Sequence, residues 1–257
     1  MKNIAFNAFR LLLLLCASSI AMTGQAERDM SRDQFRHPVE TIEFFGLTSE
    51  MDVIEITPGG GWYTEILAGY IKGTLLAAHF NPDSKAKYYL RSRKVFEEKI
   101  AANPALYGNV EMHTFDASAS LLTTADNSAD ALVTFRNVHN WLSSGNEAKA
   151  FELFYKTLKP GGVFGVVEHR AAPGTARAVM LSSGYMTQDY VIELAERAGF
   201  VLEASAEINA NPKDNADHPK GVWTLPPSLR LGAQDRDKYL AIGESDRMTL
   251  KFRKPKR

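Results

Sequence analysis

Residues 51–64, MDVIEITPGGGWYT, carry the strongest structural signal in this sequence. An apolar run ends near the acid Glu55, a proline and three glycines follow, and a helix-like pattern begins at Trp62. This order is typical of a strand, a tight turn and a helix N-terminus. A glycine-rich turn lets the backbone approach a ligand, and the following helix directs free N–H groups to the same place. The stretch therefore predicts a ligand-binding turn.

Short apolar runs alternate with segments of helical spacing on both sides of this turn. Expected strands lie at residues 52–56, 74–79, 110–114, 129–135, 163–167, 200–208 and 248–252. Expected helices begin at Pro38, cover 62–71, 84–102 and 147–158, and run from the capping residue Thr187 to 198. Strands that alternate with helices form a mostly parallel sheet with helices on both faces.

In such sheets, ligands bind beyond the carboxyl ends of the strands. Polar residues directly follow several of the expected strands, and we expect them at one edge of the sheet. They are Glu55, His79, Asp116, the run RNVHNW at 136–141, and the tripeptide formed by Glu168, His169 and Arg170.

The first 26 residues have the layout of a secretory signal peptide. Lys2 and Arg10 form a positive region, residues 11–22 are largely apolar, and cleavage is plausible after Ala26. The apolar run is shorter than the roughly 18–20 residues that cross a bilayer. We therefore expect export, to the periplasm, and no stable membrane span after cleavage. Anchoring through an uncleaved N-terminal segment is the alternative.

Composition limits the function classes. The chain has 30 basic and 30 acidic residues, so removal of Lys2 and Arg10 leaves a small acidic excess. A nucleic-acid-binding protein usually shows a basic excess, and we expect no nucleic-acid partner. Cys16 is the only cysteine, so the mature chain can form no disulfide. Residues 27–257 have a suitable length for one α/β domain.

Four motifs together resemble one enzyme family. They are VIEITPGGGWYT (53–64), FDAS (115–118), ADALVTFRNVHNWL (129–142) and LKPGGVFGVVEHR (158–170). Over residues 38–208 the chain resembles class I S-adenosylmethionine-dependent methyltransferases, in which a helix, Lys-Pro-Gly-Gly and an apolar strand recur. With its leader, it is similar to the predicted exported bacterial methyltransferases. The resemblance implies a Rossmann-like sheet of seven strands, the last one antiparallel, and S-adenosylmethionine as cofactor.

A nicotinamide dinucleotide is the main rival ligand for the turn. Its fingerprint, Gly-x-Gly-x-x-Gly, brings a pyrophosphate against the helix N-terminus. Counted from Gly59 and Gly61, the third glycine position is Thr64. The spacing therefore disfavours a dinucleotide.

The resemblance also implies roles for the residues after the first three strands. Glu55 would lie near the methionine ammonium of the cofactor, Gly59 and Gly61 would line it, and Asp116 would meet the adenine amino group. Two positions depart from the family pattern. Thr57 stands where the family usually has its first glycine, and His79 stands where an acid usually binds both ribose hydroxyls. Either His79 has a weaker version of that role, or Asn81 or Asp83 replaces it, or the affinity is poor.

The substrate is expected beyond the fourth and fifth strands. His139 is the first candidate for a general base and His169 the second, with Glu168 orienting a neighbouring histidine. Arg136 and Arg170 are candidates for binding an anionic substrate, and Asn140 completes the expected substrate side. Residues 136–141 lack the Asn-Pro-Pro-Tyr of amino-group methylases, which argues against adenine or glutamine amide substrates.

Residues 209–237 form a long polar stretch that contains Trp223, and we expect a lid or insertion over the substrate. The histidines show no ligand-like spacing, so no metal site is predicted. The function expected from these features is methyl transfer to a small molecule. The alternative is an exported ligand-binding protein on the same scaffold without methyl-transfer activity. Composition and motifs do not predict an oligomeric state.

Overall fold

The computed structural model describes residues 28–256. The predicted signal peptide, residues 1–26, lies outside the described residues. The chain divides into two compact units, 1–31 and 32–257, and every described helix and strand belongs to the second. No helix in the described part is long and apolar enough to cross a membrane.

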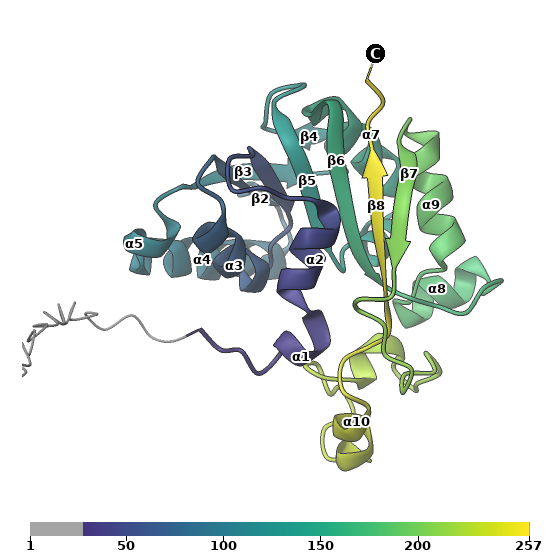
Figure 1. Ribbon diagram of the computed structural model, residues 1–257. Helices are drawn as coiled ribbons and strands as arrows, with labels where there is room; N and C mark the ends of the chain where they lie inside the picture. Colours follow the sequence, from purple (N-terminus) through teal and green to yellow (C-terminus); the bar gives the residue numbers. More distant parts are fainter. Residues whose placement is uncertain (1–27, 257) are drawn as a thin grey trace, which may run out of the picture. The chain divides into compact units, whose positions relative to one another are not determined.

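The second unit is built on one sheet of eight strands in the order β4-β3-β2-β1-β5-β6-β8-β7 (Figure 1). The strands are β1 (Val53–Ile56), β2 (Leu75–Phe80), β3 (Val110–Asp116), β4 (Leu121–Leu122), β5 (Ala129–Phe135), β6 (Leu158–His169), β7 (Val201–Ala206) and β8 (Arg247–Arg253). Within this order, the five neighbouring strands β3, β2, β1, β5 and β6 are parallel to one another. Strand β8 runs antiparallel to both of its neighbours. This confirms the predicted Rossmann-like methyltransferase sheet. The expected number of seven strands was short by one, because the two-residue strand β4 pairs antiparallel with β3 at the edge.

Helices cover both faces of this sheet (Figure 1). They are α1 (Asp33–Arg36), α2 (Pro38–Phe45), α3 (Trp62–Tyr70), α4 (Lys87–Ala102), α5 (Pro104–Tyr107), α6 (Val138–Ser143), α7 (Glu147–Thr157), α8 (Arg177–Ser183), α9 (Gln188–Arg197), the 3-10 helix η1 (Gly221–Thr224) and α10 (Arg236–Ile242). Side chains of α2, α3 and α5 share a core with one face of the sheet. Side chains of α6 to α9 share a second core with the other face.

Alternation along the central strands explains why two cores form. Side chains of a strand point to opposite faces in turn, so Ile54 and Ile56 of β1 pack on the α6–α9 side, while Val53 packs on the other. All four residues of β1 are buried, as expected for a parallel strand covered on both faces. The two cores hold β1 and β5 rigidly where the strand order reverses.

The helices expected from the sequence do not include residues 136–141, the run that follows a strand. Residues 138–143 instead form the short helix α6. Its first backbone N–H groups, on Val138 and His139, donate to the buried carboxylate of Glu168. The helix therefore depends on a partner 30 residues away in the sequence, which no local pattern reports.

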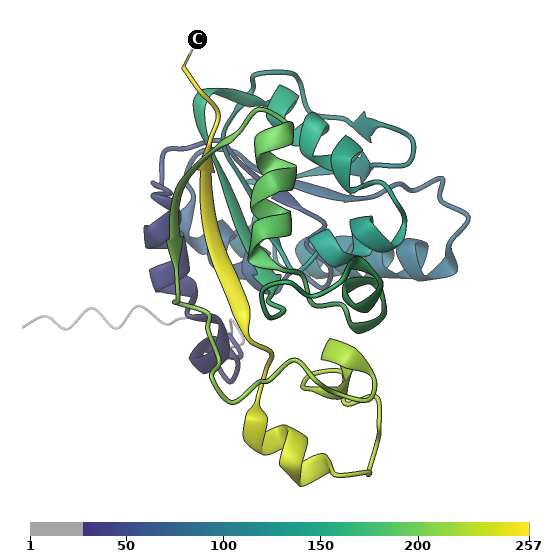
Figure 2. The ribbon, with the colours of Figure 1, turned by 90° about the vertical axis from the view of Figure 1, so that its right-hand side faces the viewer.

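Residues 207–246 connect β7 to β8 beyond the carboxyl ends of the parallel strands, with α10 farthest from the sheet (Figures 1 and 2). A buried carboxylate, Asp214, holds this segment together. It accepts hydrogen bonds from the Tyr185 hydroxyl and the Asp246 backbone N–H at 2.8 Å each, and its other oxygen lies 2.8 Å from Nε2 of His218. These hydrogen bonds connect the segment to Tyr185, which precedes α9, and to Asp246, which precedes β8.

Candidate active site

The turn after β1 combines three residues with a positive φ angle: Thr57 (52°), Gly59 (60°) and Gly61 (74°). A Cβ on Gly61 would lie 2.8 Å from the ring of Phe96, so only glycine fits there. A Cβ on Gly59 would meet nothing within 4 Å. Gly59 therefore faces open space, and the two glycines serve different purposes. Gly61 lets α4 pack against the turn, and Gly59 exposes the backbone to a ligand.

The backbone of Thr57 is strained, and its side-chain hydroxyl lacks a hydrogen-bond partner in the described structure. A β-branched residue at positive φ is a rare conformation that costs about 1–3 kcal/mol. Its hydroxyl is buried, yet it has no hydrogen-bond partner in the described structure. Its carbonyl accepts from Nδ2 of Asn137, 3.3 Å away, which ties the turn to the end of β5. A buried hydroxyl without a partner is the feature expected where a ligand supplies the missing hydrogen bond.

His79 lies behind the turn. Its Nδ1 accepts from the Phe80 N–H at 2.8 Å, so Nε2 carries the proton and donates to the Gly59 carbonyl at 3.1 Å. Burial lowers the pKa of His79 to about 4, against the opposing effect of the bond to Gly59. The ring is fully buried and lines neither cavity described below. A carboxylate could not donate to Gly59, so the histidine supports the turn in a way that the usual acid cannot. Its contact with the cofactor stays a prediction, which this geometry disfavours.

Glu55 is also buried, on the α3 side of β1. It accepts a 2.5 Å hydrogen bond from the Thr64 hydroxyl in the first turn of α3. Burial raises the pKa of Glu55 to about 7, partly offset by the Thr64 hydrogen bond and by Lys99. Lys99 itself donates to the Gly61 carbonyl at 3.1 Å and to Glu65 at 2.8 Å. Glu55 and Lys99 therefore hold the turn between α3 and α4, and Glu55 does not line the cavities.

Two adjoining cavities, of about 210 and 140 Å³, open beside the turn at the carboxyl ends of β1, β2, β3 and β5. We call them together the cofactor cleft. Both are lined by Thr57, Phe80, Tyr89, Trp141 and Ser144. Asn81, Ser84 and Asp116 line the larger cavity, and Gly59, Asn137 and Asn140 line the smaller one.

Asp116 supplies the carboxylate of the cofactor cleft. Its Oδ1 accepts from the Ser118 hydroxyl at 2.6 Å, and its Oδ2 accepts from Nδ2 of Asn81 at 3.2 Å. Burial alone would raise the pKa of Asp116, but these hydrogen bonds outweigh burial and lower it. Asp116 is therefore an ionised acceptor with lone pairs available to a donor such as an amino group.

A third cavity, of about 190 Å³, lies on the other side of α6, and we call it the acceptor cavity. Its polar wall comes from the ends of β5, β6 and β8, and residues 222–228 close it from the opposite side. The lining residues are Arg136, His139, His169, Val222, Trp223, Pro226, Pro227, Ser228 and Arg247. The structure thus brings together four residues predicted for the substrate side, including Trp223, which lies 84 residues beyond His139 in the chain.

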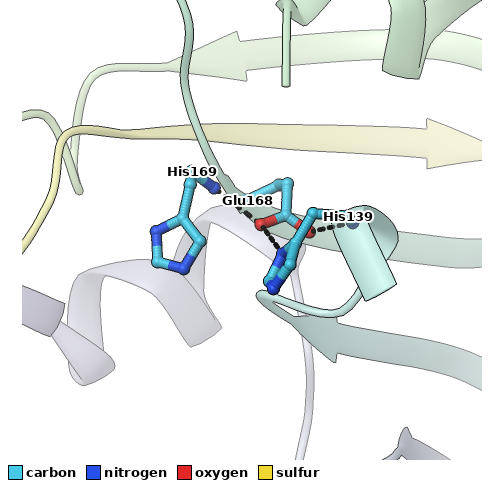
Figure 3. A group of neighbouring side chains, drawn as sticks. All are labelled: His139, Glu168 and His169. Atoms are coloured by element: carbon cyan, nitrogen blue, oxygen red, sulfur yellow. Dashed lines mark hydrogen bonds and ion pairs between the residues drawn. The ribbon is translucent and has the colours of Figure 1, made fainter. Parts of the chain in front are cut away.

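Glu168 holds His139 in place (Figure 3). Its Oε1 lies 3.0 Å from Nδ1 of His139, and its Oε2 accepts from the backbone N–H groups of Val138 and His139. A carboxylate can only accept, so Nδ1 carries the proton of the neutral ring and Nε2 is left as an acceptor. Figure 3 shows both imidazole rings on the same side of β6. This is the arrangement of a histidine base with an orienting carboxylate.

His169 differs from His139 because a hydroxyl, not a carboxylate, is its partner. Its Nδ1 lies 2.6 Å from Oγ of Ser245. Burial, and next the electrostatic interactions with His139 and Arg247, hold its pKa well below the usual value. His169 is therefore neutral at physiological pH.

Possible ligand atoms of His139, Glu168 and His169 all lie within 4.8 Å of one another, close enough to hold a metal ion. The sequence spacing gave no sign of this group, because His139 comes from α6 and the other two members come from the end of β6. Both oxygens of Glu168 already accept hydrogen bonds from backbone N–H groups. Arg136 and Arg247 line the same cavity, and their charges repel a cation. The surroundings favour a hydrogen-bonded base over a metal centre.

Two of the predicted substrate residues lie apart from the acceptor cavity. The Arg170 guanidinium is engaged by Glu207, with two 2.7 Å hydrogen bonds, and by Asp246 at 2.8 Å. Asn140 lines the cofactor cleft. Sequence reasoning in turn missed Arg247, which reaches the cavity from β8. Its position before an apolar strand gave no functional signal.

A family model described as a methyltransferase domain matches residues 54–166, which include the turn, Asp116 and His139. The comparison with curated proteins finds no match.

Solved structures agree with this domain. A SAM-dependent methyltransferase from Aquifex aeolicus is 16% identical, with 88% of this chain and 94% of that chain covered and a TM-score of 0.59. A proposed sarcosine dimethylglycine methyltransferase from Galdieria sulphuraria is 14% identical, with 90% and 87% covered and a TM-score of 0.63. The [4+2]-cyclase SpnF is 17% identical, with 91% and 85% covered and a TM-score of 0.60. At these identities the likeness establishes the methyltransferase fold.

The methyltransferase domain and these neighbours imply S-adenosylmethionine as cofactor. The cofactor cleft fits it on three observations. Gly59 leaves the backbone open, Thr57 offers a buried hydroxyl without a partner, and Asp116 offers a carboxylate at the far end. The ribose position is the departure. Because His79 is turned away, the polar groups available to the ribose are those of Asn81 and Ser84.

Proposed function

We propose that this protein transfers a methyl group from S-adenosylmethionine to a small molecule bound beside His139. The observation that carries the proposal is the pairing of the cofactor cleft with a cavity that contains a carboxylate-oriented histidine. The cofactor cleft lies where the strand order reverses between β1 and β5, the place where open α/β sheets bind ligands, and the acceptor cavity lies beyond the ends of β5, β6 and β8.

The bound cofactor supplies an electrophilic methyl group on a sulfonium. The residues of the chain supply position and proton transfer. Helix α6 contributes to both sites, with Trp141 lining the cofactor cleft and His139 lining the acceptor cavity. A hydroxyl acceptor held beside His139 would pass its proton to Nε2, and Glu168 would stabilise the imidazolium that forms. Residues 222–228 would keep water out of the acceptor cavity.

The proposed acceptor is a small molecule, methylated at oxygen, nitrogen or carbon. The acceptor cavity is enclosed on one side by Trp223 and two prolines, which leaves room for a compact ligand only. The balanced charge of the chain supports the proposal that no nucleic acid is involved.

Export to the periplasm is part of the proposal and rests on residues 1–26 alone. Cell fractionation tests it, with the mass of the chain as the second readout. A shortened chain in the periplasmic fraction supports export with cleavage. A full-length chain in the membrane fraction would instead support the uncleaved anchor.

Calorimetric titration of the purified mature chain with S-adenosylmethionine, and with its demethylated product, tests the proposed function. We expect one molecule of either ligand to bind per chain. A His139→Gln variant should bind both with unchanged affinity, because His139 lies outside the cofactor cleft. If neither S-adenosylmethionine nor its demethylated product binds at millimolar concentration, methyl transfer is rejected and the ligand-binding alternative is favoured.

A further inference from the structure

Four arginines gather at and behind the wall of the acceptor cavity and share one carboxylate. Arg32, Arg36 and Arg247 all form ion pairs with Glu244. Arg136 has no hydrogen bond or ion pair from its side chain to any described residue. We call Arg32, Arg36, Arg136 and Arg247 the arginine cluster. Its members come from α1, the end of β5 and the start of β8, so the fold gathers them from three distant segments.

The cluster has more donors than partners. Both terminal nitrogens of Arg36, one terminal nitrogen of Arg32 and Nε of Arg247 are buried and have no hydrogen-bond partner in the part of the chain that is described. Arg36 and Arg247 are each only 2% exposed. Buried guanidinium groups normally use their N–H groups in hydrogen bonds, because the unpaired state is costly.

The charge of the cluster is also uncompensated. Burial and the neighbouring Arg136 charge lower the pKa of Arg36 to about 8, and burial and the Arg247 charge lower that of Arg136 to about 10. The arginines also shift the pKa of Glu244. Burial alone would raise its pKa, but the charges of Arg247 and Arg36 lower it to about 2. One carboxylate is therefore too little for four neighbouring cations, two of which, Arg36 and Arg247, are buried, and an anion would relieve the excess.

Arg136 is held in a conformation that its own backbone disfavours. Its φ angle is +63°, in the left-handed region. It enters the acceptor cavity together with Arg247, while Val222, Trp223 and the two prolines give the cavity an apolar side. Strained residues cluster at ligand-binding sites, where the ligand interaction compensates for the strain.

We propose that the acceptor cavity binds the oxyanion of a compact, partly apolar molecule, a carboxylate or phosphate group, through Arg136 and Arg247. This rests on the proposed function, because the same molecule would be the methyl acceptor. The oxyanion faces the arginines, and the apolar part packs against Trp223, close to Nε2 of His139. A guanidinium matches both oxyanions with two parallel N–H donors.

The test uses benzoate, its neutral isostere benzamide, and inorganic phosphate as probes. Each is titrated calorimetrically into the mature chain at constant ionic strength without S-adenosylmethionine. We expect benzoate and phosphate to bind, and benzamide to bind at least about tenfold more weakly, since it lacks the charge that the arginines recognise. Equal affinity for benzoate and benzamide, or no binding of either anion at tens of millimolar, would overturn the proposal.

Arg136→Asn is the decisive variant, because asparagine tolerates a positive φ angle and carries no charge. We expect anion affinity to fall at least about tenfold, while the melting temperature stays equal or rises, since the variant removes a positive charge close to those of Arg36 and Arg247. Arg197→Gln removes one exposed charge far from the cavity and should keep full anion affinity. Unchanged anion affinity in Arg136→Asn would overturn the proposal.

The same preparations separate this inference from the proposed function. Anion binding without any S-adenosylmethionine binding would retain the oxyanion site and reject methyl transfer. S-adenosylmethionine binding without anion binding would retain methyl transfer and overturn the oxyanion site.

Discussion

Two non-glycine residues at positive φ, Thr57 after β1 and Arg136 after β5, stand side by side in the sheet order. Each lines a cavity, and the Thr57 hydroxyl is buried without a hydrogen-bond partner in the described chain. They differ in what supports them. His79, Asn137 and Lys99 donate hydrogen bonds to the backbone around Thr57. The side chain of Arg136 instead faces other cations.

The difference indicates two kinds of site. The turn after β1 is a backbone cradle, in which side-chain donors bind the carbonyls and one hydroxyl has no partner. The end of β5 is an electrostatic site with an excess of positive charge. A backbone cradle suits a ligand shared by a whole family, because backbone geometry recognises it. Charge excess selects a particular substrate chemistry.

The largest effect that we expect comes from Gly59→Val. A side chain there would enter the cofactor cleft at a φ angle that valine disfavours, so affinity for S-adenosylmethionine should fall at least about a hundredfold. Calorimetric titration measures it. Gly232→Val is the matched control, since Gly232 also has a positive φ, of 64°, and open space around its Cβ. Equal loss of affinity in both variants would mean that backbone strain alone is responsible.

Next in size is the effect of pH on Glu55→Gln. The folded pKa of Glu55, about 7, exceeds the unfolded value of 4.5, so its contribution to stability is complete below pH 4.5 and is lost as pH rises to 7. The free energy of unfolding of the variant should therefore rise relative to that of the wild type between pH 4.5 and pH 7, by about 3 kcal/mol at pH 8. Urea unfolding at pH 4.5 and pH 8 measures the difference.

His79 makes the stability of the fold depend on pH in the opposite direction. Its folded pKa, about 4, lies below the unfolded value of 6.5, so its contribution is present above pH 6.5 and is lost as pH falls to 4. In the wild type the two slopes partly cancel. Glu55→Gln should therefore show a steeper loss of stability on acidification than the wild type. A parallel pH profile in the two proteins would contradict both assignments.

A smaller effect is expected for Glu168→Gln. An amide has only one acceptor oxygen, so a backbone N–H group at the start of α6 or on His169 must lose its partner, at a cost of about 2 kcal/mol. The control Glu203→Gln removes a more exposed carboxylate that pairs with Lys251 and Arg253, and should cost less than about 1 kcal/mol. Denaturant unfolding ranks the two. Equal losses would mean that Glu168 is not the anchor of α6.

The smallest expected effect returns to the strained pair. Thr57→Gly should stabilise the fold by about 1 kcal/mol by relieving the positive φ angle. It should leave anion binding at the acceptor cavity unchanged, which thermal unfolding with and without benzoate measures. A change in anion affinity would show that the two sites are coupled through Asn137.

The sequence predicted the sheet well because its signals are local. Apolar runs, the glycines of 59–61 and the Lys-Pro-Gly-Gly turn report strand and turn positions directly, and Thr187 does cap α9 by accepting from the Tyr190 N–H. Lys254 donates to the Tyr155 and Leu158 carbonyls, which local charge could not reveal.

The amino-acid sequence by itself determined the strand–turn–helix unit at residues 51–64, the positions of the strands along the chain and the residues that could carry chemistry. These features depend on neighbours in the chain. The tertiary structure alone decided their use. It turned His79 toward the glycine turn, engaged Arg170 with two carboxylates and brought Arg247 beside Arg136. Hydrogen bonds and charge interactions act over a few ångströms in space whatever the separation in sequence, so only the folded chain fixes which polar groups are paired and which are left for a ligand.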